Sequence, residues 1–302
     1  MNTTFVKWSS IENSYRTKEI NYYRQLFPDL DEYQYVITEK LHGSNVSFHF
    51  KAGQPMCVAR RNGMLAPDED FYGVRELIHK YQDGFDAMQK MAEGADDTIR
   101  IYGEIFGPGV QKGVDYGDEK RIAFFGIKRF DMLFPFDVFL SMLPGTLMTV
   151  PIVATSISLQ DALDFDIGFT SLVGNSLCEG IVIQPRCVVL EDNHGSPFLL
   201  KKKNEEFAEV EKQERVIDEA VNSLQQEIGN YVTAARLGSI FSKEGEISSP
   251  KQIGSYIKLM IEDVSVDFAK DYQEFADMDK GQQGQVLKVV GKLTANLLRE
   301  YL

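Results

Sequence analysis

A lysine placed just before a glycine turn is the residue of this sequence best suited to covalent chemistry. Lys40 stands in the run EKLHGSN at residues 39–45, where Gly43 lets a bound phosphate approach the backbone closely. This placement suits a lysine nucleophile. A free ammonium has a pKa near ~10.4 and reacts poorly at neutral pH, so desolvation or neighbouring cations must lower that pKa. The pattern K-x-x-G is very common, and an ordinary structural turn is the alternative.

A second group of cations follows far along the chain, in the run LLKKKN at residues 199–204. If this run is a strand, alternation places Lys201 and Lys203 on one face and Lys202 on the other. Two ammonium groups on one face could neutralise a nucleotide phosphate and depress the pKa of Lys40. The alternative is a solvated surface, which a triple lysine usually indicates.

Two carboxylates stand in apolar, strand-like surroundings. Glu104 follows Ile101, Tyr102 and Gly103, and Glu179 precedes the run GIVI at residues 180–183. A buried acid needs a partner. A divalent cation or a ribose hydroxyl would supply one, and a structural salt bridge is the equally weighted alternative.

Guanidinium groups and aromatic rings alternate in a third region. The run RRNG at residues 60–63, which includes Arg61, precedes DFYG at residues 70–73, and together they combine phosphate-binding groups with stacking rings. A surface turn followed by core aromatics explains the same residues. Phe125 lies in another apolar run, where an aromatic is more often core than a base-stacking platform.

The elements that must position these side chains are short strands. Residues 35–42 and 45–50 form two extended runs around Gly43 and Ser44, and we predict that these two strands pair with each other. Further strands are predicted at residues 100–105, 122–127, 180–184 and 198–203, with a helix near 74–91. The fold class is therefore α+β, a domain of mostly antiparallel sheets with helices.

The remainder of the chain is helical. Near residue 205 the composition shifts, and apolar residues then recur at helical spacing at 217–228, 253–264 and 286–301. Ser249 can cap the middle helix, with Pro250 at its first position and Gln252 completing a capping box. We predict a first domain at residues 1–212 and a small all-α domain at 213–302. The charged stretch 204–215 is expected to hold the linker, and a solvated helix is the alternative.

Length and composition limit the possible classes of protein. The 302 residues, 43% hydrophobic and 25% charged, predict two globular domains, with no membrane-spanning run and no signal-peptide core. We therefore expect a cytoplasmic or nuclear protein. Its three cysteines are an odd number with no C-x-x-C spacing, so we expect them to be reduced thiols. The net charge of −13 argues against a broadly polyanion-binding surface, so any nucleic-acid surface must be a local patch.

The order of these motifs resembles the covalent nucleotidyltransferases, the superfamily of lysine-dependent ligases and capping enzymes. The motifs occur along this chain in the same order as in that superfamily: Lys40-x-x-Gly43, the Arg61 run, Glu104, the Phe125 run, Glu179-Gly180 and the triple lysine. Finer detail resembles the phage RNA ligase 2 family, which includes the trypanosome RNA-editing ligases: EKLHGSN, EDFYG at 69–73, and FGPGVQK at 106–112 continuing to Asp115 and Tyr116. The resemblance extends to the helical region.

The resemblance implies an ATP-dependent RNA ligase that seals nicks in duplex RNA. Lys40 would take AMP from ATP, AMP would pass to an RNA 5′-phosphate, and the 3′-hydroxyl would displace it. The implied cofactors are ATP and Mg²⁺ or Mn²⁺, and the implied partner is nicked duplex RNA bound by a monomer. The family's roles carry over as follows: backbone recognition of adenine by Glu39, ribose binding by Glu104, base stacking by Phe125, phosphate or metal-shell contacts by His42, Asn45 and Arg61, metal binding by Glu179 and Glu104, and α-phosphate binding by Lys201 and Lys203.

Two positions depart from the family pattern. Gly126 stands where an acid usually follows the stacking aromatic, and Gln184 stands where a lysine often follows the Glu-Gly strand. Two other functions remain open. A DNA ligase or capping enzyme normally places an OB-type barrel where this chain has helices. A non-catalytic RNA-binding module is the other alternative. It would have no reason to retain all five charged residues Lys40, Glu104, Glu179, Lys201 and Lys203.

Overall fold

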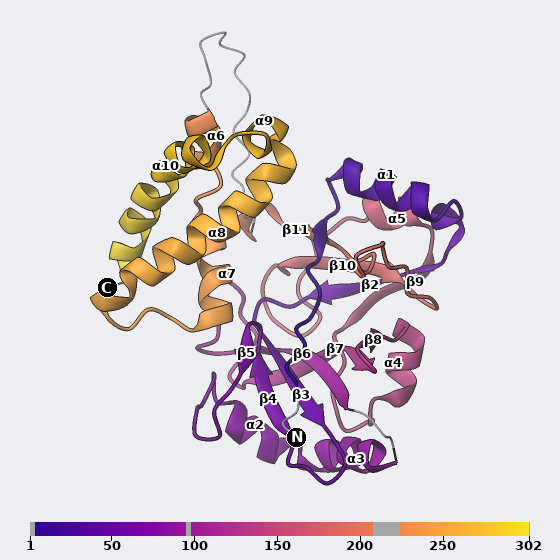
Figure 1. The fold of residues 1–302 in the computed structure, drawn as a ribbon. Coiled ribbons are helices and arrows are strands. Elements are labelled where there is room, and N and C mark those ends of the chain that lie inside the picture. Colours follow the sequence, from indigo (N-terminus) through magenta and orange to yellow (C-terminus); the bar gives the residue numbers. More distant parts are fainter. Residues whose placement is uncertain (1–3, 95–97, 208–223, 302) are drawn as a thin grey trace. The chain divides into compact units, whose positions relative to one another are not determined.

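The computed structural model describes residues 4–94, 98–207 and 224–301 (Figure 1). It divides into two compact units, Met1–Asn204 and Glu205–Leu302, each described here by itself. The predicted boundary between residues 212 and 213 lies outside the described residues. None of the described helices combines the length and apolar character that a membrane crossing requires.

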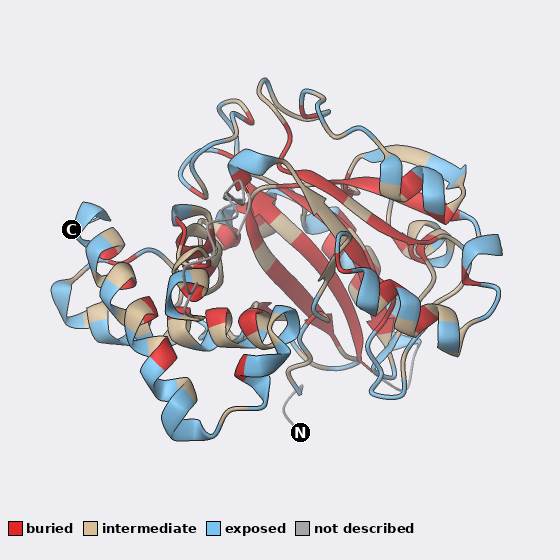
Figure 2. Cartoon of the chain, turned by 90° about the horizontal axis from the view of Figure 1, so that it is seen from above, coloured by how far each residue is buried: buried red, intermediate tan, exposed pale blue. Residues whose placement is uncertain are grey.

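A five-stranded sheet forms one half of the first unit, in the order β1-β11-β10-β2-β9. Its strands are β1 (Glu12–Asn13), β2 (Tyr35–Lys40), β9 (Ile152–Ile157), β10 (Gly180–Pro185) and β11 (Leu200–Lys203). All neighbours are antiparallel except β1 and β11, which are parallel. Because β2 is flanked on both sides, Val36 and Ile37 are fully buried, as β-branched residues of an inner strand should be. Figure 2 shows that the strands of the first unit are largely buried.

A six-stranded antiparallel sheet forms the other half, in the order β5-β4-β3-β6-β7-β8. Its strands are β3 (Ser44–Phe50), β4 (Cys57–Arg60), β5 (Gly63–Met64), β6 (Ile99–Phe106), β7 (Arg121–Arg129) and β8 (Met132–Leu133). The predicted mostly antiparallel α+β fold is confirmed. On β3, alternation sends Val46 and Phe48 into the apolar core, while Ser47 and His49 bond to each other on the opposite face.

The predicted pairing of residues 35–42 with 45–50 is wrong, because β2 and β3 belong to different sheets. Gly43 lies so close to β6 that an added Cβ would come within 2.1 Å of the Ile105 carbonyl oxygen. The chain therefore passes through a tight crossing that admits only glycine, and each strand continues into its own sheet.

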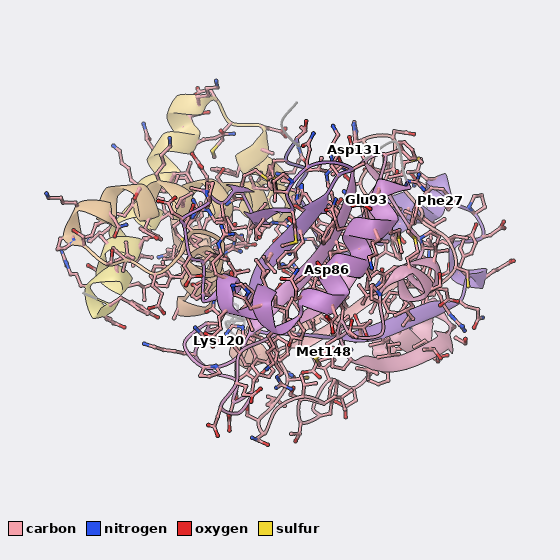
Figure 3. All side chains as sticks on the ribbon, turned by 90° about the horizontal axis from the view of Figure 1, so that it is seen from below. Phe27, Asp86, Glu93, Lys120, Asp131 and Met148 are labelled. Carbon is pink, nitrogen blue, oxygen red and sulfur yellow. The ribbon has the colours of Figure 1, made fainter. Side chains whose placement is uncertain are left out.

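Helices cover both sheets. The helices α1 (Thr17–Leu26) and α5 (Leu159–Asp164) pack on the first sheet, and η1 (Leu30–Glu32) joins the same core. The helices α2 (Val74–Lys80), α3 (Gln82–Glu93) and α4 (Phe136–Met142) pack on the second. The helix predicted near residues 74–91 is thus two helices separated at Tyr81. Asp86 and Glu93 occupy exposed positions of α3 (Figure 3), whose other side buries Phe85 against Phe48.

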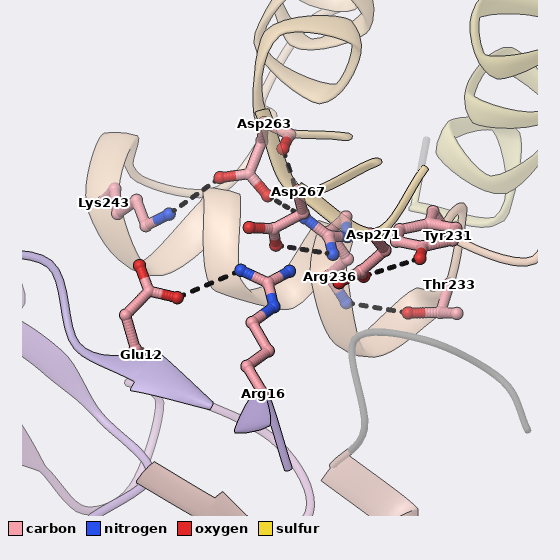
Figure 4. Close-up of polar contacts among 9 residues, drawn as sticks. All are labelled: Glu12, Arg16, Tyr231, Thr233, Arg236, Lys243, Asp263, Asp267 and Asp271. Carbon is pink, nitrogen blue, oxygen red and sulfur yellow. Dashed lines mark hydrogen bonds and ion pairs between the residues drawn. The ribbon is translucent and has the colours of Figure 1, made fainter. Parts of the chain in front are cut away.

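The amino-terminal segment runs across both sheets. Val6 accepts a hydrogen bond from the Tyr102 hydroxyl at 2.7 Å, Trp8 packs on the second sheet, and β1 then pairs with β11 of the first. Arg16 forms an ion pair with Glu12 at 3.0 Å (Figure 4). The segment therefore covers the polar face of β3 and completes one edge of the first sheet.

The second unit is helical, as predicted. Its elements are η2 (Glu205–Phe207), α6 (Leu224–Gly229), α7 (Ala234–Glu244), η3 (Pro250–Gln252), α8 (Ile253–Asp271), α9 (Gln273–Ala276), α10 (Lys280–Leu298) and η4 (Arg299–Tyr301). The predicted capping box of Ser249 and Gln252 is present, at the start of η3. Of the first predicted stripe, residues 217–221 lie outside the described residues, and Ile228 is buried.

A charged network lies inside this helical unit. The fully buried Arg236 of α7 pairs with Asp263 and with Asp267, the latter at 3.0 Å, on successive turns of α8 (Figure 4). Lys243 reaches the same Asp263 at 3.2 Å. This network joins α7 to α8 within an otherwise apolar core.

Candidate active site

Lys40 is the last residue of β2, at the edge of the five-stranded sheet. Its register partner on β10 is Gly180, so the neighbouring Glu179 lies beside the lysine. Lys40 Nζ is 2.9 Å from Glu179 Oε1 and 2.8 Å from Oε2, and 22% of its side chain is exposed. The candidate nucleophile is therefore accessible and, without a ligand, held by a buried carboxylate.

Lys203 pairs with the same carboxylate, its Nζ lying 3.0 Å from Glu179 Oε1. Gly180 lies opposite both Lys40 and Lys203, so three adjacent strands bring the three charges together. Burial opposes ionisation of Glu179, but Lys40 and Lys203, together with His42, outweigh burial and hold the pKa of that carboxyl well below its usual range. The structure thus brings together a lysine of each predicted basic motif and one of the two predicted carboxylates.

The predicted alternation along β11 accounts for the middle lysine. Lys202 Nζ donates to the carbonyl oxygens of Leu163 and Phe165, both at 2.8 Å, whereas Lys203 reaches Glu179. Lys202 is thus a structural residue at the end of α5 and is not merely solvated. Lys201 lies between Val182 and Asn13 in the sheet register.

Glycine at position 180 is a steric requirement. An added Cβ would lie 2.0 Å from the Lys202 carbonyl oxygen. The backbone N–H of Asn204 also donates to the Glu179 carbonyl at 2.9 Å. This close approach of β10 to β11 fixes where the Glu179 side chain begins.

His42 connects the loop after Lys40 to the run that begins with FGPGVQK at residues 106–112 and continues to Tyr116. Its backbone N–H donates to the Tyr116 hydroxyl at 2.7 Å, and its Nε2 lies 2.9 Å from the Lys112 carbonyl. A carbonyl only accepts, so Nε2 carries the proton in this contact. Nδ1 lies 3.5 Å from Glu179 Oε2. His42 therefore bridges residues 112–116 and the central carboxylate.

The carboxylate of Glu39 is completely engaged away from Lys40. It accepts from the Ser171 hydroxyl at 2.5 Å and from the Leu172 backbone N–H at 2.8 Å. Burial raises the pKa of Glu39, and these two hydrogen bonds oppose the rise. The Glu39 backbone N–H donates to Pro151. Any recognition of a base by this residue's backbone thus falls to its carbonyl.

Glu104 supplies a second carboxylate from β6, directly opposite Asn45 of β3. Burial raises its pKa to about 8, against the opposing influence of Lys40 and Arg61, while the charge of Glu179 raises it further. Burial lowers the pKa of Arg61, and the Glu104 charge counters this effect. These mutual influences place Glu104, Arg61 and the Lys40–Glu179 pair in one electrostatic cluster.

Phe125 lies half-buried on β7, in edge contact with Trp8 at a ring-centroid distance of 4.9 Å. The same indole explains the departure at Gly126, where a Cβ would come within 2.3 Å of Trp8. Gln184 is buried on β10 opposite Val36. The amino-terminal segment therefore supports the aromatic ring predicted to stack on a base.

The carboxylates fit a divalent cation only in part. Among the residues that the structure describes, no group of three or more His, Cys, Asp or Glu side chains could hold a metal ion. Glu104 and Glu179 nevertheless offer carboxylate oxygens, half-buried and buried respectively, whose charges repel each other. Mg²⁺ is commonly bound by one or two carboxylates together with waters and substrate phosphates. The donor set therefore suits a cation that arrives with a nucleotide.

Sequence reasoning missed the residues that brace this site from outside. Arg121 donates from one guanidinium nitrogen to the carbonyls of Tyr116, at 2.9 Å, and Val173, at 2.7 Å. It thereby ties the loop that contacts His42 to the loop that binds Glu39. Only the run FGPGVQK and its continuation to Tyr116 signalled part of this framework.

Two models of known protein families match this chain. A family model described as RNA ligase matches residues 33–203, and one described as T4 RNA ligase 2 C-terminal matches residues 214–295. The first match contains Lys40, Glu104, Glu179 and Lys203, and the second covers most of the helical unit.

Individual relatives are distant. The mitochondrial RNA-editing ligase 2 of Trypanosoma brucei brucei is 29% identical over 110 residues, which is 34% of this chain and 25% of that protein.

Mutant forms of the Naegleria gruberi RNA ligase share the fold. One is apo (TM-score 0.51, 19% identity, 67% of this chain and 57% of that one), and one holds ATP and Mn (0.52, 17%, 68% and 58%). This chain thus spans a quarter of the curated relative and less than three fifths of these solved chains. Since the RNA ligase model covers more than half of the sequence, the chain belongs to the RNA ligase family.

Proposed function

We propose that this protein is an ATP-dependent RNA ligase that joins a 3′-hydroxyl to a 5′-phosphate, with nicked duplex RNA as its substrate. The observation that carries the proposal is the cluster at the end of β2, where Lys40 meets Glu179 and Lys203 beside Glu104. This set provides a nucleophile and charges that can neutralise phosphates. It suits phosphoryl transfer, which depends on positioning and electrostatic stabilisation more than on proton transfer.

In the first step, Lys40 Nζ gives up a proton to solvent, attacks the α-phosphorus of ATP and forms a phosphoamide bond as pyrophosphate leaves. An ammonium has no lone pair, so Lys40 must lose its proton and turn from the Glu179 carboxylate toward the α-phosphorus before it attacks. Lys203, which lies beside the same carboxylate, is proposed to bind the α-phosphate. Lys201 is assigned the same role from the family resemblance.

The next two steps use the same groups. AMP passes from Lys40 to the RNA 5′-phosphate, and the 3′-hydroxyl then attacks that phosphorus and releases AMP. Phe125 is proposed to stack on adenine and Glu104 to bind the ribose. His42, Asn45 and Arg61 are proposed to contact phosphates or the metal shell, with His42 fixed by Tyr116 and the Lys112 carbonyl.

A divalent cation fits this proposal as a companion of the nucleotide. Mg²⁺ or Mn²⁺ bound at Glu179 and Glu104 would neutralise charge on the phosphates and compete with Lys40 for the Glu179 carboxylate. A structure of the Naegleria gruberi ligase is described with ATP and Mn. Lys203 and His42 would then keep Glu179 oriented from the other side.

Incubation with ATP labelled at the α-phosphate, followed by denaturing electrophoresis, tests the proposal. We expect label on the protein and none on Lys40→Ala, which should still join pre-adenylylated RNA at a reduced rate because the nucleophile serves only the first step. Undiminished labelling of Lys40→Ala contradicts the assignment. Labelling by GTP instead favours a capping enzyme, and no labelling at all favours a non-catalytic RNA-binding module.

Nicked duplexes with RNA or DNA on each side of the nick test the substrate. We expect sealing when RNA flanks the nick and little sealing of all-DNA duplexes. Equal or faster sealing of an all-DNA nick favours the DNA ligase alternative.

A further inference from the structure

One helix of the second unit carries a charge pattern unlike the rest of the protein. The chain as a whole has 45 acidic and 32 basic residues, yet α10 (Lys280–Leu298) contains no acidic residue. It holds Lys280, Lys288 and Lys292, and Arg299 follows directly. The nearest acids are Asp279, whose carboxylate caps the helix by accepting from Gly281 and Gln282, and Glu300 beyond its end.

Lys288, Lys292 and Arg299 lie on one exposed face, which Lys280 does not share. The exposed residues Gln285, Lys288, Lys292, Asn296 and Arg299 fall within roughly 80° of the helix circumference and extend over about 21 Å. We call these five residues the α10 stripe. Its opposite face buries Val286, Val290 and Leu298 in the core of the unit. The stripe therefore presents only amides and cations to the surroundings.

Ordinary helix energetics do not account for the stripe. A cation near a helix C-terminus is stabilised by the helix dipole, but that effect is confined to the last turn and explains only Arg299. Lys288 and Lys292 are four residues apart, a like-charge spacing that destabilises a helix by a few tenths of a kcal/mol. No residue that the structure describes forms an ion pair with either lysine. Lys258 of α8, by contrast, has Glu262 at 3.8 Å.

We propose that the α10 stripe binds the sugar-phosphate backbone of the RNA duplex. This inference rests on the proposed function, because it assigns the α10 stripe to the surface by which the ligase binds its RNA substrate. Charge complementarity favours a polyanion, and the amide and guanidinium donors match phosphate and hydroxyl oxygens. A lipid surface would require apolar residues on the exposed face, whereas the apolar face of α10 is buried in its own domain.

The test compares two full-length variants of equal charge. Lys288→Gln/Lys292→Gln removes two cations from the stripe, and Lys251→Gln/Lys258→Gln removes two exposed lysines from η3 and α8. Binding of a fluorescent nicked RNA duplex is measured by anisotropy, without ATP, between about 50 and 200 mM salt. Glutamine preserves helix propensity, and thermal unfolding of each variant verifies the fold.

Each lost phosphate contact lowers the slope of log affinity against log salt concentration by about 0.9. We expect the stripe variant to lose nearly two units of slope and the control variant to keep the wild-type slope. Over a fourfold rise in salt, two contacts correspond to about a twelvefold change in affinity. Equal slopes in wild type and stripe variant overturn the inference, and so does an equal loss in the control.

ATP labelling of Lys40 separates this inference from the proposed function. All variants should label at the wild-type rate, because none alters the nucleotide cluster. If wild type fails to label, the proposed ligase activity is wrong, whereas the salt slopes still report whether the stripe binds RNA. If labelling proceeds and the stripe variant binds RNA as wild type does, only the stripe assignment fails.

Discussion

Glu104 and Glu179 carry the same functional group, but the protein shifts their pKa values in opposite directions. Burial holds the pKa of Glu104 at about 8, while two ammonium groups hold that of Glu179 well below its usual range. Between pH 4.5 and 8 the unfolded chain loses the Glu104 proton and the folded protein keeps it, so stability falls as pH rises. For Glu179 the sign is reversed, because ionisation is favoured in the folded state.

We therefore expect Glu104→Gln to stabilise the protein, by about 1–2 kcal/mol near pH 8, with a gain that shrinks toward pH 5. Differential scanning fluorimetry of both proteins across this pH range measures the gain. A constant difference in melting temperature contradicts the assigned titration.

Glu179→Gln should have the opposite effect, since it leaves Lys40 and Lys203 adjacent with no carboxylate between them. Its melting temperature should lie below that of wild type at pH 7, and the deficit should shrink as the pH falls below the usual carboxyl range. Stability equal to wild type at neutral pH would contradict the ion-pair arrangement.

At this scale the sequence is informative about charged residues in recognisable runs, and not about residues that only support them. Lys40, Glu179 and Lys203 were identifiable because the chemistry needs charged groups in recognisable runs. Arg121 and Ser171 were not, since they act through carbonyl oxygens and a neighbouring carboxylate. Nothing in the type or spacing of a residue encodes which distant backbone atom it will bind.

Single elements also carry two roles at once, and β11 is the clearest case. Its alternation gives Lys203 to the nucleotide cluster and Lys202 to the end of α5. We expect Lys202→Ala to lose about 1–3 kcal/mol of unfolding free energy while the folded protein still labels with ATP. Lys203→Ala should label poorly without a comparable loss of stability. Urea unfolding and the labelling rate measure the two effects, and equal loss of labelling at both positions contradicts the separation.

The amino-terminal segment and β7 are complementary in shape at Trp8 and Gly126. Gly126→Ala should cost about 1–3 kcal/mol by overpacking, and Trp8→Ala about 3–5 kcal/mol by leaving a cavity. In the double variant the added methyl occupies space that the indole vacated, so its cost should fall short of the sum by about 1 kcal/mol or more. Urea unfolding of the four proteins gives the coupling, and strictly additive costs would refute the packing.

Strand existence was predictable at this scale, whereas strand partnership was not. Residues 44–50 alternate in polarity and residues 35–40 form an extended run that is apolar at its start, but such patterns identify a strand and not its neighbour. The close approach of Gly43 to Ile105 decides the partnership, and residue 105 is more than sixty positions away. The break at Tyr81 within the predicted helix 74–91 likewise follows from tertiary packing.

For the molecule as a whole, every residue assigned to nucleotide chemistry lies in the unit Met1–Asn204. A fragment ending at residue 212 should therefore still label at Lys40. Transfer of AMP to nicked RNA should fall steeply, because remote contacts orient the RNA 5′-phosphate. Separate assays of the two steps measure this, and full-rate sealing by the fragment would show that the helical unit serves another purpose.

The helical unit can be weakened on its own through Arg236. Arg236→Met leaves Asp263 and Asp267 without their buried partner and should cost about 2–4 kcal/mol, reduced by the partial exposure of both acids. Lys243→Gln, which removes a more exposed contact to the same Asp263, should cost under ~1 kcal/mol. Calorimetry measures both costs. ATP labelling should survive in each variant, and its loss in Arg236→Met would show that the two units fold together.

The crossing at residues 41–43 also predicts where the gene can change length. In a hairpin, an inserted residue enlarges the turn and leaves both strands in register. Here it would lengthen the connection between two sheets and shift Lys40 relative to Asn45. The turn at Gly53, whose surroundings are open, has no such constraint. Codon insertions should therefore be tolerated around residue 53 and eliminated between residues 40 and 44, so the fixed spacing of the lysine motif records the distance between two sheets.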